Sequence, residues 1–133
     1  MILDLDLHGG VPIYRQVMDQ VRRQVLTGQL KEGQQVESVK NLAERLKVNP
    51  MTISKAYSFL VEDSVLERRR GVGLFVRSIR KDTMRRQQST MLKNALQQVV
   101  ALAVQMKVPE KEALRLFSEQ YRRMDASGTS KRP

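Results

Sequence analysis

Two short stretches of the chain, residues 39–46 and 50–61, each carry one narrow apolar stripe, and only a tight connection separates them. Apolar residues recur three or four positions apart in both stretches, which predicts two helices that each bury a single face. Two such stripes on either side of a turn need a third helix to cover them, and residues 12–27 provide it. The sequence therefore predicts a helix-turn-helix inside a three-helix core. The stripes consist of Val39, Leu42, Ala43 and Leu46, and of Ile53, Ala56, Tyr57, Leu60 and Val61.

Residues that favour helix ends stand where these helices should begin and stop. Ser38 and Asn49 are good N-caps, and Pro50 suits a first helical position because its missing N–H would have no partner there. We expect the first helix to start at Pro12 and to stop at Gly28. Its stripe is Tyr14, Val17, Met18, Val21 and Val25, and residues 29–36 after it are expected to be a polar connection.

The segment SVLERRRGVGLFVRSI follows the second helix of the motif and predicts a β-hairpin. Val65–Glu67 read as the start of a strand and Leu74–Val76 as its return, and Gly71 and Gly73 permit the reversal. Such a hairpin is marginal alone and has to pack on the helical core. Three arginines are expected at its tip: Arg68, Arg69 and Arg70. We interpret residues 1–79 as a winged helix-turn-helix domain.

Residues 80–133 form the second predicted region. A helical pattern runs from Arg80 to about Lys107, Val108-Pro109 ends it, and a last helix is expected from Pro109 to about Met124, with a frayed polar end. The predicted fold is thus mainly α with a small β-hairpin wing, followed by a two-helix antiparallel dimerisation hairpin.

The apolar stripes of this region are too long for a two-helix hairpin to bury alone. A second copy would complete a four-helix arrangement, and we expect a homodimer. The alternative, in which residues 80–124 fold back on their own winged domain, stays open. The residues expected in the dimer contact are Leu92, Leu96, Val99, Ala103, Met106, Leu114, Phe117 and Tyr121.

The charge of the chain indicates a polyanionic partner. Its 133 residues hold 24 Lys and Arg against 14 Asp and Glu, a formal net charge of +10, which favours nucleic acid or an anionic membrane face. Residues 68–86 alone hold eight cations and one anion. For this run taken alone, a solvated charge run at a domain junction is the simpler interpretation.

Composition also limits the chemistry. The chain has no cysteine and one histidine, which excludes disulfides, thiolate nucleophiles and cysteine zinc sites, and no carboxylate cluster suggests a metal. No nucleophile–base set, Walker loop or carboxylate pair indicates an enzyme, and no cofactor is predicted. The longest apolar run, VVALAV, is too short to cross a bilayer. The N-terminus lacks the features of a signal peptide, so we expect a cytoplasmic protein.

The second helix of the motif has an outer face without a carboxylate before Glu62. A carboxylate in the first turn would be favoured by the helix dipole but repelled by phosphates. The face carries Met51, Thr52, Ser54, Lys55 and Ser58, side chains able to meet base edges in a major groove. A plain solvated face with Asn49 as a cap is the alternative. The arginine-tipped hairpin beside it favours DNA.

Two further residues have less certain positions in the sequence pattern. Lys40 could reach a phosphate or be an ordinary surface lysine. Phe59 lies off the apolar stripe and is expected to pack under the hairpin.

At residues 37–76 the sequence ESVKNLAERLKVNPMTISKAYSFLVEDSVLERRRGVGLFV resembles the winged-helix domain of the GntR family of bacterial transcription regulators. The family pattern reads roughly P-S-x-R-x-L-A, then L-G-V-x-x-x-T-V-x-x-A-Y, then R-x-G-x-G-x-F-V. The stretch from Gly9 is similar to the family's first helix. The resemblance implies a phosphate contact for Lys40, base contacts for Asn49, Met51, Thr52, Ser54 and Lys55, and wing glycines at Gly71 and Gly73.

The chain departs from this pattern at four positions. Lys40 replaces an arginine and keeps the charge but cannot make a bidentate fork, which implies a weaker phosphate contact. Glu37 replaces a proline and would put an anion beside the binding face. Lys47 and Ser64 stand where glycines are usual.

The short helical tail resembles the YtrA-type subgroup of that family, in which a helical hairpin pairs with its copy. We therefore expect a dimeric, sequence-specific DNA-binding transcription regulator, a repressor on a palindromic operator with half-sites about 34 Å apart. A partner-binding adaptor, with its tail docked on another protein and an incidental or membrane-directed basic surface, is the alternative. The sequence leaves open whether a small-molecule effector exists.

Overall fold

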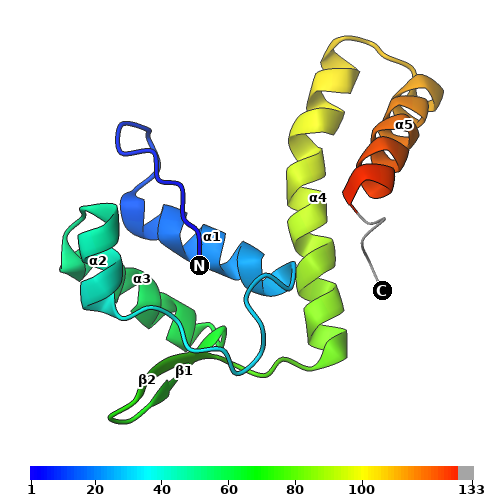
Figure 1. Cartoon of the computed structure of the whole chain (residues 1–133). Coiled ribbons are helices and arrows are strands. Elements are labelled where there is room, and N and C mark those ends of the chain that lie inside the picture. Colours follow the sequence, from blue (N-terminus) through cyan, green and yellow to red (C-terminus); the bar gives the residue numbers. More distant parts are fainter. Residues whose placement is uncertain (129–133) are drawn as a thin grey trace. The chain divides into compact units, whose positions relative to one another are not determined.

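The computed structural model describes residues 1–128, which form five helices and one two-stranded antiparallel sheet (Figure 1). The elements are α1 (Ile13–Leu26), α2 (Val39–Leu46), α3 (Pro50–Glu62), β1 (Leu66–Arg69), β2 (Gly73–Val76), α4 (Lys81–Gln105) and α5 (Glu110–Gly128). The chain divides into two compact units, the first ending at Gln88 and the second starting at Ser89. This confirms the predicted mainly α fold with a small hairpin.

The core of the first unit forms around the apolar stripe of α3. Ile53 and Leu60 are 0% exposed and Tyr57 is 2% exposed, because α1 packs on one flank of α3 and α2 on the other (Figure 1). Val17 and Val21 of α1 are also fully buried against this core. The three-helix core predicted from the stripes is confirmed.

Both predicted caps of the helix-turn-helix are formed. The Ser38 Oγ accepts a hydrogen bond from the Asn41 N–H (3.1 Å), and the Asn49 Oδ1 accepts one from the Met51 N–H (2.8 Å). Lys47 joins the helices in the left-handed conformation, with φ of 58°, and Ser64 adopts a φ of 62° after α3. These are two positions where the sequence has a side chain instead of a glycine, so the backbone there is strained.

An extended lead, residues 2–6, lies along α1 and is held by three of its glutamines, a set we call the glutamine ladder. Gln20 exchanges two hydrogen bonds with the backbone of Asp4 (2.8 and 2.6 Å), and Gln16 does the same with Asp6 (both 2.8 Å). The buried Gln24 donates to the carbonyl of Ile2. The spacings match because four helical residues rise about 6 Å and two extended residues span about 6.6 Å.

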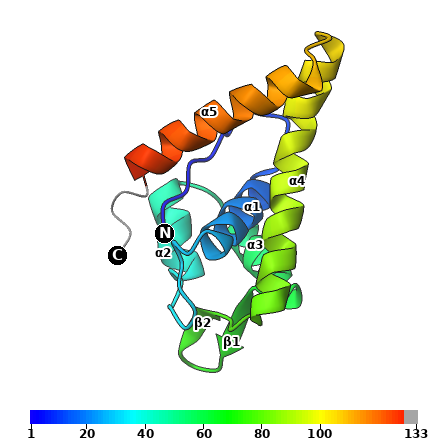
Figure 2. The same ribbon diagram turned by 90° about the vertical axis from the view of Figure 1, so that its right-hand side faces the viewer.

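The hairpin reverses later than the sequence suggested. Arg68 pairs with Leu74 and Arg69 with Gly73, so both arginines lie on β1, and only Arg70 of the three lies in the turn. Figure 2 shows the two paired strands and the turn that joins them. The expectation of three arginines at the tip is therefore wrong for two of them. The reason is that the strands stay paired up to Arg69 and Gly73. The chain therefore reverses after Arg69, where Gly71 adopts a positive φ of 75°.

The connection before α2 pairs with the wing, which we define as β1, β2 and the turn between them. The Val36 N–H donates to the Leu74 carbonyl (2.9 Å) and the Val76 N–H to the Gln34 carbonyl (2.8 Å). Val36 is buried, and Gln35 forms a β-bridge with Phe75. Residues 29–36 were expected to be a plain polar connection. They instead cover the free edge of β2 and tie the wing to the helices.

The second unit holds the part of α4 from Ser89 onward and the whole of α5. Lys107 turns the chain with a φ of 58°, and α5 starts after Pro109 as predicted. The last helix continues to Gly128 and not just to Met124. Residues 129–133, part of the end expected to fray, lie outside the described residues. In residues 1–128 no helix has the length and apolarity that crossing a bilayer would require.

The strain at Ser64 predicts a stability change. Replacing Ser64 by glycine relieves the left-handed backbone at a position outside the sheet, and we expect the free energy of unfolding to rise by about 0.5–1 kcal/mol. Urea denaturation of the full chain measures it. Ser64→Ala is the control and should give no increase, because alanine is strained in the same conformation.

The two wing glycines should differ in how much they tolerate a side chain. A Cβ on Gly73 would come 2.7 Å from the Gln35 Nε2, at a φ of 139°, whereas a Cβ on Gly71 would meet nothing within 4 Å. We expect Gly73→Ala to cost about 2–3 kcal/mol of unfolding free energy and Gly71→Ala about 1 kcal/mol. Equal losses in urea denaturation would contradict this account of the wing.

Candidate nucleic-acid interface

The outer face of α3, which lies opposite its buried stripe, is open to solvent. Met51 is 75% exposed, and Ser54, Lys55 and Ser58 are exposed as well. Helix periodicity therefore brings these predicted site residues onto one surface. Thr52 is half-buried on the flank of the helix. Asn49 is exposed, and its Oδ1 is engaged in the cap.

Lys55 does not extend straight into solvent. Its Nζ lies 4.1 Å from the centroid of the Tyr14 ring of α1, a cation–π contact. Phe59 stacks on the same ring with centroids 5.8 Å apart. The expectation that Phe59 packs under the hairpin is wrong, because its ring lies on Tyr14 of α1. The spacing of Lys55 and Phe59, one helical turn apart, was the signal that both could reach one residue.

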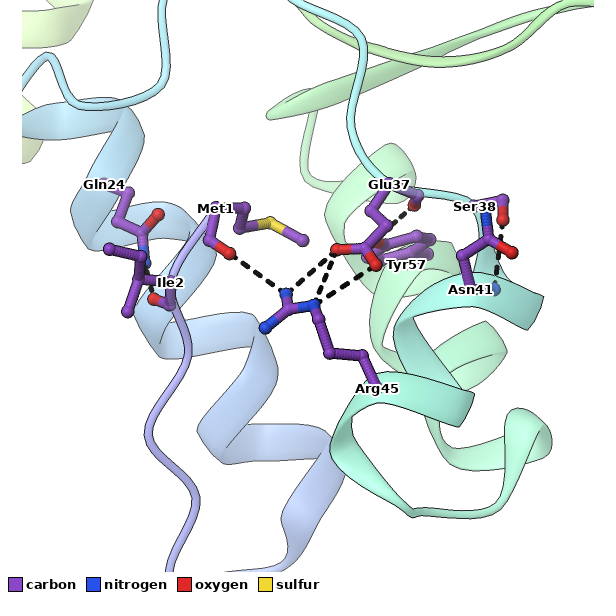
Figure 3. A network of polar contacts seen from close by, with 8 residues as sticks. All are labelled: Met1, Ile2, Gln24, Glu37, Ser38, Asn41, Arg45 and Tyr57. Carbon is purple, nitrogen blue, oxygen red and sulfur yellow. Dashed lines mark hydrogen bonds and ion pairs between the residues drawn. The ribbon is translucent and has the colours of Figure 1, made fainter.

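Glu37 is paired within the protein. Its carboxylate accepts hydrogen bonds from the Arg45 Nη2 (2.9 Å) and Nε (3.2 Å), and Arg45 also donates to the Met1 carbonyl (Figure 3). The hydrogen bond to Glu37 raises the pKa of the Arg45 guanidinium. The anion that was expected to disturb the binding face is thus compensated by a cation eight residues away, a pairing that single-sequence reasoning missed.

Tyr57 connects this ion pair to the core. Its hydroxyl donates to the Glu37 backbone carbonyl (2.8 Å), and Figure 3 shows the ring beside the Glu37–Arg45 pair. Burial raises the pKa of the Tyr57 hydroxyl, so the group stays protonated and remains a donor. The contact fixes the segment that leads into α2, and with it the start of the helix that carries the exposed Lys40.

The wing presents its arginines in different states. The Arg69 guanidinium lies 4.1 Å over the Phe75 ring, and its Nη2 is 3.0 Å from the Glu67 Oε1. Arg68 and Arg70 are exposed on the strand and in the turn. Gly71 and Gly73 shape the reversal, and the Gln35 Nε2 donates to the Val72 carbonyl (3.0 Å) to hold it. The first unit therefore offers a polar helix face and a basic hairpin, both of which suit a duplex.

Comparisons with known proteins agree with this geometry. The model for the bacterial regulatory proteins of the gntR family matches residues 13–76, which span α1 to β2. The HTH-type transcriptional repressor YtrA of Bacillus subtilis is 33% identical over 99 residues, covering 74% of this chain and 76% of that protein.

Solved structures resemble the chain as well. YtrA from Sulfolobus acidocaldarius, a GntR-family transcription factor, has a TM-score of 0.57 at 31% identity and covers 72% of this chain and 98% of its own. The structure of AraR(DBD) in complex with operator ORX1 has a TM-score of 0.51 at 26% identity, over 57% of this chain and 98% of its own. The family is one of DNA-binding transcription regulators and not of enzymes. The chain belongs to the gntR family of bacterial regulatory proteins, and its similarity to YtrA supports the YtrA-type subfamily.

Proposed function

We propose that the protein is a repressor that binds a palindromic operator as a homodimer. The observation that carries the proposal is that α3 has two different faces. One face buries Ile53 and Leu60 completely, and the other exposes Met51, Ser54 and Lys55 to solvent. A helix held this firmly can present its first turns to a major groove as a rigid reader. The repressor name of the Bacillus relative supports the direction of regulation.

In this proposal the exposed cations bind the backbone of the duplex. Arg68 and Arg70 of the wing and Lys40 of α2 are exposed and can neutralise phosphates without a sequence preference. Arg69 has a second task, because its contacts with Phe75 and Glu67 brace the wing. The Glu37–Arg45 pair keeps an uncompensated anion away from this surface. The cytoplasm, where bacterial DNA lies, is the expected place of action.

The second unit supplies the dimer contact of the proposal. No residue of α4 is buried; Val99 is 61% exposed, and Tyr121 on α5 is 62% exposed. Large apolar side chains exposed in rows mark an interaction surface. Leu96 and Ala103 are half-buried, and the other expected contact residues are exposed: Leu92, Val99, Met106, Leu114, Phe117 and Tyr121.

A second copy is the occupant we favour for this surface. Val100 and Val104 widen the apolar surface of α4 beyond the predicted stripe, and both are exposed. A helix of a four-helix bundle needs such width because it touches two neighbours. A two-fold dimer would also give the symmetry of a palindromic operator. Docking on a different protein is the adaptor alternative, and the mass measurement below separates the two.

The DNA proposal is tested with the full chain. Selection from a random duplex pool should yield a symmetric motif, and unrelated DNA should not displace the protein from it. Arg70→Ala should weaken binding to all sequences alike and reduce the slope of log K against log salt by about 0.9. Lys93→Ala, which removes an exposed cation of α4, is the control and should leave that slope unchanged. An Arg70→Ala variant with altered base preference would contradict the assigned role.

The dimer proposal is tested by mass in solution. Sedimentation equilibrium should give twice the chain mass of 15.3 kDa. Val99→Asp should shift it to the single-chain mass, because a carboxylate cannot be buried unpaired in an apolar contact. The control is Asn94→Asp, an exposed position on the side of α4 away from its apolar surface, which should remain dimeric. A monomeric wild-type chain, or a dimeric Val99→Asp variant, would overturn the proposed contact.

A further inference from the structure

We infer that Tyr14 of α1 is a positioning residue for base recognition, because it holds the Lys55 ammonium at the outer face of α3. The inference rests on the proposed function, since it assigns Lys55 to a base edge. It goes further by placing a determinant of specificity outside the helix-turn-helix. The juxtaposition that carries it is one aromatic ring of α1 contacted by two side chains of α3.

A lysine on a helix surface is ordinarily a poor reader of sequence. Its ammonium sits on a flexible four-carbon stem, and ordering that stem on binding costs entropy. Here the Nζ lies 4.1 Å from the Tyr14 ring centroid, well within the range of about 6 Å over which such contacts are attractive. The contact favours positions of the ammonium on the α1 side of the outer face before any duplex arrives.

The ring is itself fixed in place. Tyr14 is half-buried beside the core, and Phe59 stacks on it at 5.8 Å with an angle of 30° between the rings. Arg22 and Asp63 are joined at 2.6 Å, two turns further along α1 and past the end of α3. A second contact therefore joins α1 and α3 two turns away from the ring, and the stacking of Phe59 keeps the ring beside Lys55.

The chemistry of the partner suits a surface that must bind DNA. A carboxylate could also orient Lys55, but it would neutralise the ammonium and repel phosphates. An aromatic face orients the cation through its quadrupole and adds no net negative charge. The ammonium thus keeps its ability to donate to the guanine O6 and N7 acceptors of the major groove. The ring provides direction, and the lysine provides the contact.

The test uses full-length variants and the duplex selected by the wild-type protein. Affinity is measured for that duplex and for versions with each base pair replaced in turn. Lys55→Ala should lose discrimination at one base pair of each half-site. Tyr14→Leu should lose two- to fivefold in discrimination at the same pair, the size of an exposed cation–π contact. Tyr14→Phe, which keeps the ring, should behave like the wild type.

A double variant separates positioning from packing. Tyr14→Leu should have no further effect on discrimination once Lys55 is alanine, because the ring then has no ammonium to hold. Urea denaturation checks that Tyr14→Leu remains folded. If Tyr14→Leu does not fold, Tyr14→Phe still tests the inference, because it keeps the ring and must therefore keep the discrimination. Three results would overturn the inference. Tyr14→Phe could lose discrimination, or Lys55→Ala could keep it. Tyr14→Leu could also reduce discrimination as much in the Lys55→Ala variant as in the chain that keeps Lys55. A wild-type chain that selects no duplex would overturn the proposed function instead.

Discussion

The burial of one face of α3 is the constraint on which the rest of the first unit depends. Ile53, Leu60 and Tyr57 leave water almost completely, and α1 and α2 are both placed by their contact with this stripe. Each large apolar side chain of this kind stabilises the fold by about 1.5–3 kcal/mol relative to an exposed one. Because the stripe is narrow, the opposite face of α3 is left uncovered, and the packing that forms the core also exposes the face that we propose reads DNA.

The cations near this surface are stabilised in two ways, and the difference matters for binding. Arg45 is paired with the Glu37 carboxylate and belongs to the scaffold. Lys55 lies on an aromatic ring, and Arg69 combines a ring with a carboxylate. A ring orients a cation and leaves its charge available, whereas a carboxylate cancels it. The positive charge of this surface therefore rests on Lys55, which the Tyr14 ring orients, and on the exposed Arg68 and Arg70 of the wing.

Local patterns predicted most of this fold, and contacts between distant residues account for what they missed. Helix starts could be read from Ser38 and Asn49 because capping involves neighbouring residues. The bridge from Gln35 to Phe75 joins segments forty residues apart, and no periodicity reveals it. The same holds for the site: exposure of Met51 follows from helix geometry, whereas the Tyr14 partner of Lys55 depends on how two helices cross.

The glutamine ladder has a consequence for how the lead can vary. Every second residue of the extended lead is hydrogen-bonded through its backbone to a glutamine side chain of α1, and these glutamines are four residues apart in the sequence. Inserting or deleting one residue between Ile2 and Asp6 would shift the alternation of the lead's backbone groups relative to the glutamines. The carbonyls that now face the amides would then point the other way. The segment looks like a loop in the sequence, yet its length is as tightly restricted as the register of a sheet.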